Sequence, residues 1–317
     1  MLLYLRERGL VGDEGDYSAR ELVGGVSSVV IEVEGPLSHL VVKQSLPRLR
    51  VAAEWLANRE RILTEAAALK FVAAATPGRA PRVIDIDASH YTITIEHAPN
   101  GWSSWKQQLF DGTARGRVAR GLGETLATWH RVATDDGDLL APFVDRDTFF
   151  QLRVEPYYLT VAERHIGLAA RIGVLVEEME KRAHCFVHGD FSPKNILSGP
   201  GGFWVLDFEV AHVGDPVFDI AFMLHHLVLK AIHTGHVDRV KRIAAEFVSG
   251  YRSIQGGYAL TEPEYLAAHI GCLLLGRVDG KSPAEYLTVE GRSVARAEGI
   301  RLVSGERGAY EELWIPR

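Results

Sequence analysis

Three side chains with oxygen ligands follow two apolar segments in the middle of the chain. Asp190 and Asn195 come after one such segment in CFVHGDFSPKNIL, and Asp207 ends the next, WVLD, beyond a Gly/Pro-rich turn. Phosphoryl transfer needs oxygen ligands for metal ions and a carboxylate that accepts the proton of the attacking hydroxyl. Asp, Asn, Ser and Pro also dominate ordinary turns, but the spacing to Asp207 favours catalysis.

Lys43 follows the apolar run Leu40–Val42, where burial of an ammonium group is costly unless anions surround it. The phosphates of a nucleotide and a carboxylate from a helix would be suitable partners. The helical segment that follows offers three such carboxylates, Glu54, Glu60 and Glu65.

A glycine and serine turn precedes Lys43, between strand-like residues. Backbone N–H groups and a hydroxyl in such a turn can approach a phosphate. The turn contains Gly24, Gly25 and Ser27, which we therefore expect near the nucleotide.

These residues form part of a pattern that resembles the aminoglycoside phosphotransferase and choline kinase superfamily, which includes 5-methylthioribose kinase. The pattern consists of His188-Gly189-Asp190, Asn195, Leu206-Asp207-Phe208-Glu209, Gly214-Asp215-Pro216 and Asp219. The resemblance extends from about Leu22 to Leu229. It implies a protein-kinase-like fold, ATP or GTP as phosphoryl donor, and Mg²⁺.

Position by position, the resemblance makes Asp190 the catalytic base, and Asn195 and Asp207 ligands of Mg²⁺. Glu209 lies two residues after Asp207, so both side chains point to the same side of an extended segment. Glu209 is therefore either a ligand of a second metal ion or a solvated loop carboxylate. Lys194 either touches the transferred phosphate or is a surface lysine, and we prefer the second interpretation.

The resemblance gives His188, Asp215 and Asp219 structural roles. His188 also invites a role as general base, because unperturbed histidine titrates near neutrality. We prefer a structural hydrogen bond for it.

The resemblance also selects Glu65 as the partner of Lys43, because Glu65 precedes Ala-Ala-Ala-Leu, with Glu60 as a competitor. It places the backbone groups of Glu96 and Ala98 at the edge of the adenine ring.

An α+β fold with two lobes is expected to position these groups. Period-two and β-branched patterns predict strands, and apolar residues at three- and four-residue spacings predict helices. We expect strands over 26–33, 39–43, 83–87 and 91–95, a helix over 51–75, and further helices over 116–130, 161–181, 218–233, 237–251 and 262–275. The N-terminal ATP-binding lobe is expected to be 1–98, and the catalytic and substrate-binding lobe 99–317.

Composition narrows the range of partners. The 41 acidic and 35 basic side chains are scattered, and no basic stripe exists for a phosphate backbone, so we expect no nucleic-acid partner. Cys185 and Cys272 lie in apolar stretches typical of buried packing. We find no secretory signal and no run of about 18 uncharged apolar residues. We therefore expect a cytoplasmic protein without a membrane partner, while the oligomeric state is undefined.

The predicted function is ATP-dependent phosphorylation of a hydroxyl on a small molecule, either an aminoglycoside-type antibiotic or a sugar-like metabolite. A non-catalytic nucleotide-binding pseudokinase or scaffold is the alternative, although such a protein would lack the lysine, the base or a metal ligand. A protein kinase is disfavoured because the path from Asp207 to Asp219 is too short for an activation segment.

A methylthioribose- or choline-type metabolite kinase stays open within the family. Trp102, Trp105 and Trp129 with His130 suggest a box for a cationic ligand such as choline. Packing in a helical core is the commoner use of such residues.

Overall fold

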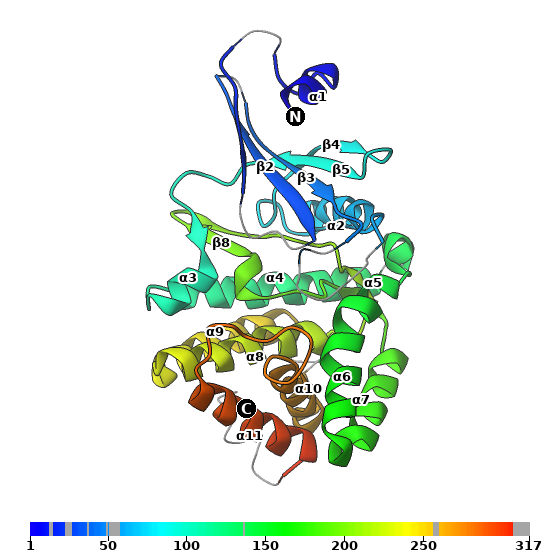
Figure 1. The fold of residues 1–317 in the computed structure, drawn as a ribbon, viewed down its shortest axis with the longest axis vertical. Helices are drawn as coiled ribbons and strands as arrows, with labels where there is room; N and C mark the ends of the chain where they lie inside the picture. The colour runs from blue at the N-terminus through cyan, green and yellow to red at the C-terminus, as the bar shows by residue number, and fades with distance from the viewer. Residues whose placement is uncertain are drawn as a thin grey trace.

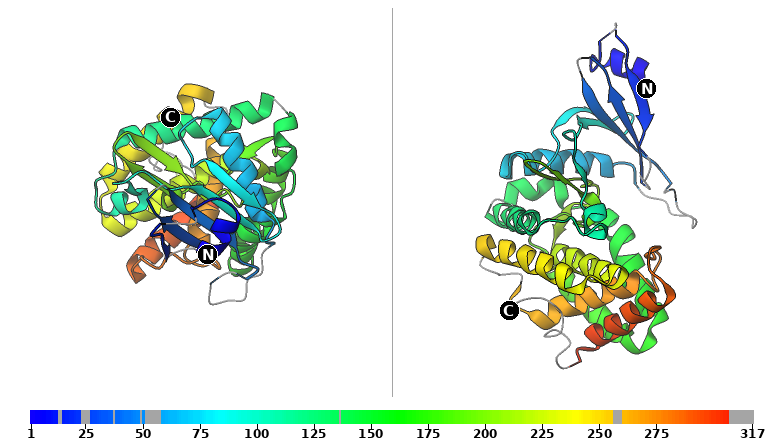
Figure 2. Two further views of the ribbon diagram at one scale, coloured as in Figure 1. Left: turned by 90° about the horizontal axis from the view of Figure 1, so that it is seen from above. Right: turned by 90° about the vertical axis from the view of Figure 1, so that its left-hand side faces the viewer.

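The computed structural model describes residues 1–12, 15–22, 27–36, 38–48, 50, 58–135, 137–255 and 260–306. A β-rich part carries the N-terminus, and a mainly helical part carries the later elements, as Figure 1 shows with the sheet above the helices. Two further views show the same division (Figure 2). The α+β, two-lobed fold class predicted from the sequence is confirmed.

The N-terminal sheet has five antiparallel strands in the order β1-β2-β3-β5-β4. They are β1 Ser18–Glu21, β2 Ser28–Glu34, β3 His39–Ser45, β4 Val83–Asp87 and β5 Thr92–Glu96. The four predicted strands are present, with 83–87 matched at both ends and the other ends shifted by at most two residues. Strand β1 was not predicted, because all four of its residues are exposed and produce no alternating apolar pattern.

The alternation of side chains in β3 orients Lys43. Leu40 and Val42 join a small apolar cluster with Leu5 of helix α1 (Leu2–Glu7) on one face of the sheet. Val41 and Lys43 point to the opposite face, where both line a cavity. This is the period of two expected for a strand, and it commits Lys43 to the interior.

Helix α2 spans Arg61–Ala75, so the predicted helix over 51–75 began too early. Residues 51–57 lie outside the described residues, and Asn58, Arg59 and Glu60 are not helical. The Asn58 side-chain oxygen accepts a hydrogen bond from the Glu60 N–H at 3.0 Å, a local turn that competes with the helix.

The helical part is larger and is crossed by short strands. Its principal helices are α3 Trp105–Phe110, α4 Gly116–Asp135, α6 Thr160–Arg164, α7 Ala169–Lys181, α8 Val217–Thr234, α9 Val237–Gln255, α10 Pro263–Gly276 and α11 Val289–Ser304. Shorter helical segments are η1 Gly137–Phe143, α5 Asp147–Phe149, η2 Phe150–Leu159, η3 Ile166–Leu168 and η4 Pro193–Asn195. The strands are β6 Ser103–Ser104, β7 Cys185–Val187, β8 Ile196–Gly199, β9 Gly202–Val205 and β10 His212–Gly214.

The predictions over 116–130, 218–233, 237–251 and 262–275 are confirmed by α4, α8, α9 and α10. The single helix predicted over 161–181 is wrong, because the chain breaks into α6, η3 and α7 around His165, whose backbone is not helical. Helix α11 was not predicted, since few of its residues are large and buried. It lies close to α10, where a Cβ on Gly271 would meet the Gly299 carbonyl oxygen at 2.8 Å.

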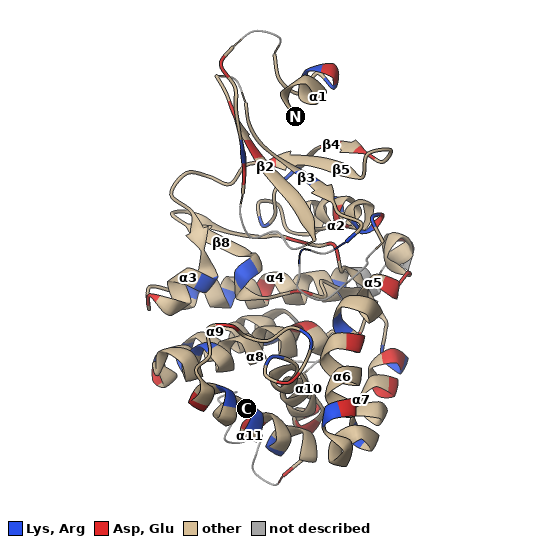
Figure 3. Cartoon of the chain, in the orientation of Figure 1, with Lys and Arg blue, Asp and Glu red and all other residues tan. Residues whose placement is uncertain are grey.

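Helix α8 is the one helix among the described residues that is long and apolar enough to cross a membrane by those criteria alone. It contains Asp219 and Lys230, and 83% of its apolar window is buried inside the protein. This burial is the pattern of a core helix. Charged side chains of both signs are interspersed over the other elements (Figure 3).

Asp219 fixes the loop that follows β7. Its two carboxylate oxygens accept hydrogen bonds from the His188 N–H at 2.7 Å and the Gly189 N–H at 2.9 Å, and the side chain is fully buried. Gly189 has φ of 76°, and a Cβ there would meet the Val210 carbonyl oxygen at 2.6 Å. The loop therefore needs glycine at this position and an acceptor beneath it.

Substitution Asp219→Ala should lower the free energy of unfolding by about 2–6 kcal/mol, because two buried N–H groups lose their acceptor at about 1–3 kcal/mol each. Urea unfolding followed by circular dichroism measures this loss. The exposed Glu177→Ala on α7 is a control and should change stability little. Equal stabilities of the two variants would contradict the role given to Asp219.

Candidate active site

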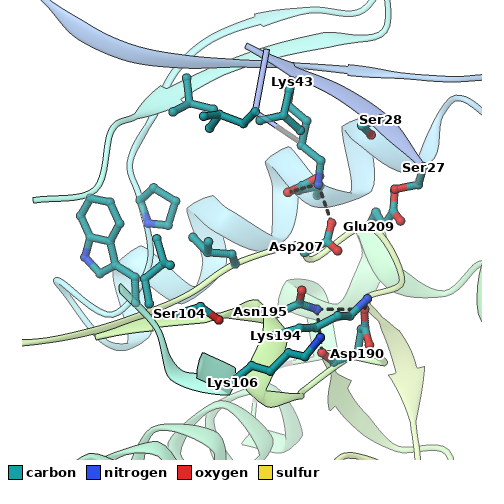
Figure 4. A pocket seen from close by; sticks show the side chains of 18 of the residues that line it. Ser27, Ser28, Lys43, Ser104, Lys106, Asp190, Lys194, Asn195, Asp207 and Glu209 are labelled. Atoms are coloured by element: carbon teal, nitrogen blue, oxygen red, sulfur yellow. Dashed lines mark hydrogen bonds and ion pairs between the residues drawn. The ribbon is translucent and has the colours of Figure 1, made fainter. Parts of the chain in front are cut away.

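A cavity of about 740 Å³ lies between the sheet and the helical part (Figure 4). Its lining includes Lys43 and Glu65 from the N-terminal part, and Asp190, Asn195 and Asp207 from the helical part. The structure thus brings together five of the residues singled out in the sequence, from segments up to 164 residues apart.

Lys43 contacts two carboxylates. Its Nζ lies 2.7 Å from Glu65 Oε2 and 2.5 Å from Asp207 Oδ1. Burial alone would lower the pKa of Lys43, but the charges of Asp207 and Glu65 outweigh burial and raise that pKa. The lysine is therefore a permanent cation that joins the two parts of the protein, and its partner is Glu65 and not Glu60.

With Lys43, Glu65 and Asp207 all ionised, the three groups together carry one surplus negative charge. Burial raises the pKa of Glu65 to about 7, with Lys43 opposing the rise and Asp207 adding to it. The pKa of Asp207 is lowered, because the positive charges of Lys43 and Lys194 outweigh its burial. A proton on Glu65 or a bound cation beside Asp207 would remove the surplus.

The β8–β9 hairpin sets the positions of Asn195 and Asp207. Ile196 pairs with Val205, and the Leu206 N–H donates to the Asn195 carbonyl oxygen at 2.8 Å. Both polar residues therefore lie at the open end of one hairpin. Asp207 adopts φ of 68°, a conformation that non-glycine residues rarely use and that turns its side chain out of the strand.

Asp190 is held at one oxygen. Its Oδ2 receives Lys194 Nζ at 2.9 Å, Asn195 Nδ2 at 2.9 Å and an Arg153 guanidinium nitrogen at 3.1 Å. These closest contacts all fall on Oδ2 and leave Oδ1 to face a ligand. Burial alone would raise the pKa of Asp190, but the charges of Lys194 and Arg153 outweigh burial and hold that pKa below its usual value.

Lys194 and Arg153 also line the cavity and contact Asp190, whereas sequence reasoning preferred a surface position for Lys194 and did not single out Arg153. Lys194 is about half exposed, as a surface lysine would be, yet it pairs with Asp190 and lines the cavity. Arg153 comes from η2, a π-helical segment that contains Pro156. Because proline has no N–H, Pro156 gives no α-helical bond to the Leu152 carbonyl, and Arg153 itself donates to that oxygen at 2.7 Å.

His188 uses both ring nitrogens within the protein. Its Nδ1 accepts from the Asp190 N–H at 3.1 Å, and its Nε2 lies 3.2 Å from the Leu206 carbonyl oxygen, which it can reach only as a donor. Burial lowers the pKa of His188, so the ring is neutral at physiological pH. This arrangement gives His188 the structural role that the sequence favoured.

Glu209 is buried and ion-paired, so the interpretation as a solvated loop carboxylate is wrong. Arg61 Nε lies 3.0 Å from Glu209 Oε2, and the same guanidinium donates to the carbonyl oxygens of Ser27, Leu46 and Asn58. Arg61 therefore ties the glycine and serine turn to the carboxylate beside the metal-type ligands.

The remaining predicted residues fall into three groups. Ser27, Glu96 and Ala98 line the cavity, and Gly24 and Gly25 lie outside the described residues. Asp215 accepts from the Val217 N–H at 2.9 Å and the Tyr265 hydroxyl at 2.7 Å, at the start of α8.

The tryptophan and histidine group does not form a box. Trp105, Trp129 and His130 are fully buried, and the Trp129 indole N–H donates to the Thr76 hydroxyl at 2.7 Å. These three side chains belong to the core, which was the preferred interpretation. The partly buried Trp102 lies elsewhere, where its indole N–H donates to the Pro200 carbonyl oxygen at 3.2 Å and its ring packs against Trp204.

A buried lysine and glutamate pair under an antiparallel sheet, facing a base, an amide and a carboxylate on helical loops, is typical of protein-kinase-like small-molecule phosphotransferases. The sequence model of the phosphotransferase enzyme family called APH matches residues 18–263. The chain belongs to this family, and the enzyme class and family resemblance predicted from the sequence are confirmed.

Two curated relatives are methylthioribose kinases. Methylthioribose kinase 2 of Oryza sativa subsp. japonica is 24% identical over 249 residues, which cover 69% of this chain and 58% of that protein. Methylthioribose kinase of Bacillus cereus (strain AH820) is 22% identical over 255 residues, covering 72% of this chain and 65% of that protein. The match thus spans less than two thirds of either relative.

Solved structures show the same fold at low identity. The ethanolamine kinase of Plasmodium vivax has a TM-score of 0.60 at 12% identity, over 94% of this chain and 86% of that chain. Amicoumacin kinase hAmiN, in complex with AMP-PNP, Ca²⁺ and Ami, has a TM-score of 0.57 at 14% identity, over 99% of this chain and 95% of that chain.

Substitution Lys194→Met should raise the pKa of Asp190, since it removes the largest charge that stabilises the carboxylate. The titration midpoint of the Asp190 carboxyl should then move to higher pH, which ¹³C NMR of protein labelled at aspartate measures directly. The exposed Lys70→Met on α2 is the control and should leave the midpoint in place. An unmoved or lowered midpoint in Lys194→Met would contradict the electrostatic account of this site.

Proposed function

We propose that the protein transfers the γ-phosphoryl group of ATP, or of GTP, to a hydroxyl of a small sugar-like molecule, with Mg²⁺ as the metal. The observation that carries this proposal is the single cavity lined by Lys43, Asp190, Asn195 and Asp207. The lysine, the proposed base and both proposed metal ligands are all present in this cavity, which disfavours the pseudokinase or scaffold alternative.

The residues present fit a magnesium ion by donor chemistry. Asn195 donates its amide nitrogen to Asp190, so its amide oxygen is left for a metal, and Asp207 contributes a carboxylate beside it. Mg²⁺ prefers such oxygen ligands, and it would also cancel the surplus negative charge of Lys43, Glu65 and Asp207. When bound, the ion neutralises charge on the phosphate oxygens. Glu209 is proposed as a further ligand, although Arg61 already holds one of its oxygens.

Asp190 would orient the acceptor through Oδ1. The acceptor oxygen forms a bond to the γ-phosphorus, the bond from that phosphorus to the bridging oxygen of ADP breaks, and the hydroxyl proton passes to Asp190. The low pKa of Asp190 suits a loose transition state, in which the base mainly positions the hydroxyl and accepts the proton late.

Lys43 would place the phosphates, with Glu65 holding its ammonium. Apolar residues that line the upper cavity, Leu22, Val41, Leu69 and Ile95 among them, make a slot suited to a flat adenine ring. The backbone of Glu96 and Ala98 is proposed at the edge of that ring, and the turn with Gly24, Gly25 and Ser27 over the phosphates.

The methylthioribose kinases among the relatives support a sugar-like acceptor over an aminoglycoside antibiotic. We retain residues 1–98 as the ATP-binding lobe and 99–317 as the catalytic and substrate-binding lobe. We also retain a cytoplasmic location as part of this proposal.

Substitution Asp190→Asn should reduce kcat by about 10²–10⁴-fold, because the amide does not accept the hydroxyl proton. ADP release is measured across aminoglycosides, methylthioribose, choline, homoserine and nucleosides, using the acceptor that gives turnover. Binding of ATP, followed by calorimetry, should be retained.

The exposed Glu177→Gln is the matched control and should turn over like the unmodified protein. Full phosphorylation activity in Asp190→Asn would refute the assignment of the base. Loss of ATP binding together with activity would indicate a collapsed site in place of a missing base.

A further inference from the structure

The two ends of the cavity carry opposite charge. Figure 4 shows Lys106 and Lys194 beside Asp190, on the side of the cavity opposite Lys43. Of the five carboxylates that line the cavity, the other four are paired with cations away from this end: Glu65 and Asp207 with Lys43, Glu209 with Arg61, and Glu96 with Arg82. Asp190 therefore faces four lining cations, Lys106, Arg153, Lys194 and Arg277.

Burial alone would lower the pKa of Arg277, but the charges of Tyr157, Tyr286 and Asp190 outweigh burial and raise it, although no carboxylate contacts Arg277 directly among the described residues. Arg277 follows α10, and its Nη1 donates to the Ser282 hydroxyl at 2.7 Å and lies 3.4 Å from the Tyr157 hydroxyl. In the described part of the chain it forms no ion pair with a carboxylate, and its buried Nε has no hydrogen-bond partner. A guanidinium keeps its charge at every physiological pH, so an anionic ligand would stabilise Arg277 by accepting its unused hydrogen bond.

Lys106 is also without a carboxylate among the described residues. It lies on α3, with its Nζ 5.7 Å from the centre of the Tyr286 ring, and Lys230 lies 5.6 Å from the same ring. The Arg153 guanidinium lies 5.4 Å from the centre of the Phe222 ring. Lys106 and Arg153 thus lie over aromatic faces that would otherwise attract the ammonium group of a ligand.

The pKa values of two neutral side chains, Tyr157 and His226, are lowered by positive charges at this end of the cavity. Burial alone would raise the pKa of Tyr157, but the charges of Arg277 and Arg153 outweigh burial and lower that pKa. Burial lowers the pKa of His226, and the neighbouring positive charges lower it further. His226 therefore lines the cavity as a neutral imidazole, and its Nδ1 has no partner.

We infer that the phosphoryl acceptor is an anionic hydroxylated molecule, whose carboxylate or phosphate group is bound by Arg277 and Lys106 while its hydroxyl faces Asp190. Opposite charges attract strongly in a partly buried site, and a polycation or a quaternary ammonium would be repelled. This inference rests on the proposed function and narrows it to sugar acids and sugar phosphates.

The γ-phosphate of the nucleotide does not account for all four cations. Lys194 and Arg153 contact Asp190 and are placed to meet the transferred phosphoryl group. The Lys106 Nζ lies 5.7 Å from the centre of the Tyr286 ring instead, and the Arg277 Nη1 lies 3.4 Å from the Tyr157 hydroxyl. Neither Arg277 nor Lys106 forms an ion pair with Asp190 in the described part of the chain, so we assign these two cations to the acceptor and not to the transferred phosphoryl group.

The test is a binding experiment on the protein loaded with a non-hydrolysable ATP analogue and Mg²⁺. Calorimetry compares a neutral hexose, its uronate, its phosphate ester and its amino sugar, which share the ring and differ mainly in charge, and separates carboxylate from phosphate recognition. We expect an anionic member to bind at least tenfold more tightly than the neutral one, and the amino sugar most weakly. Equal binding across the series, no detectable binding of either anion, or a preference for the amino sugar would overturn the inference.

Variants locate the effect. Arg277→Gln and Lys106→Gln should each weaken binding of the preferred anion about tenfold, with affinity for the ATP analogue unchanged, and Arg277→Lys should restore part of the loss. The exposed Arg117→Gln on α4 changes charge equally but lies outside the cavity, and should have no effect. If Arg277→Gln and Lys106→Gln weaken the ATP analogue instead, these residues serve the nucleotide and the inference is wrong.

Turnover separates this inference from the proposed function. Tight binding of an anionic member without ADP release would count against phosphoryl transfer and leave the charge preference in place. Phosphorylation of a neutral or cationic acceptor in preference to the anions would retain the kinase and overturn its anionic substrate class.

Discussion

The burial of the Lys43 ammonium is the constraint on which the rest of the site depends. A lysine on the inner face of the sheet requires carboxylates in contact with it, and it finds one on α2 and one at the end of the β8–β9 hairpin. Those two contacts join the N-terminal and helical parts across the cavity. Two carboxylates on one ammonium also leave a surplus negative charge, so the interaction that closes the site creates a need for a cation there.

A second set of buried contacts holds Asp190, the proposed base. Asp219 on α8 accepts two backbone N–H groups of the His188 and Gly189 loop, and His188 in turn contacts the Asp190 backbone and the strand leading to Asp207. Asp190 and the segment that ends in Asp207 are thus connected through the ring of His188. Buried hydrogen bonds from other elements therefore hold this loop more firmly than the local conformational preferences of its own residues.

The cavity consequently has a polarity that suits its proposed chemistry. The acidic end, with Glu65, Asp207 and Glu209, lies beside the sheet, where a metal ion and the phosphates would neutralise each other. The basic end, with Lys106, Arg153, Lys194 and Arg277, lies beyond Asp190. Arg153 and Lys194 lower the pKa of the base while contributing to the basic end. The same cations therefore set both the protonation state of Asp190 and the charge that the acceptor side favours.

The sequence by itself determined the chemistry-bearing residues and most of the elements that carry them. Asp190, Asn195 and Asp207 follow strand-like segments at short spacing, Lys43 lies in a β-branched run, and the large apolar faces of α8, α9 and α10 give a clear period. Local spacing is enough for these, because each signal is contained within a few turns or one strand.

Only the tertiary structure decided which charges meet. Arg153, Arg277 and Arg61 lie in segments without a distinctive pattern. Arg153 and Arg277 reach the cavity from a π-helical segment and a helix end, and Arg61, at a helix start, pairs with Glu209 behind the cavity lining. The break of the predicted 161–181 helix and the close α10–α11 packing also arise from long-range contacts. The partner of a charged side chain is the group that lies near it in space. Sequence spacing determines the distance between two residues only when both lie in the same helix or strand.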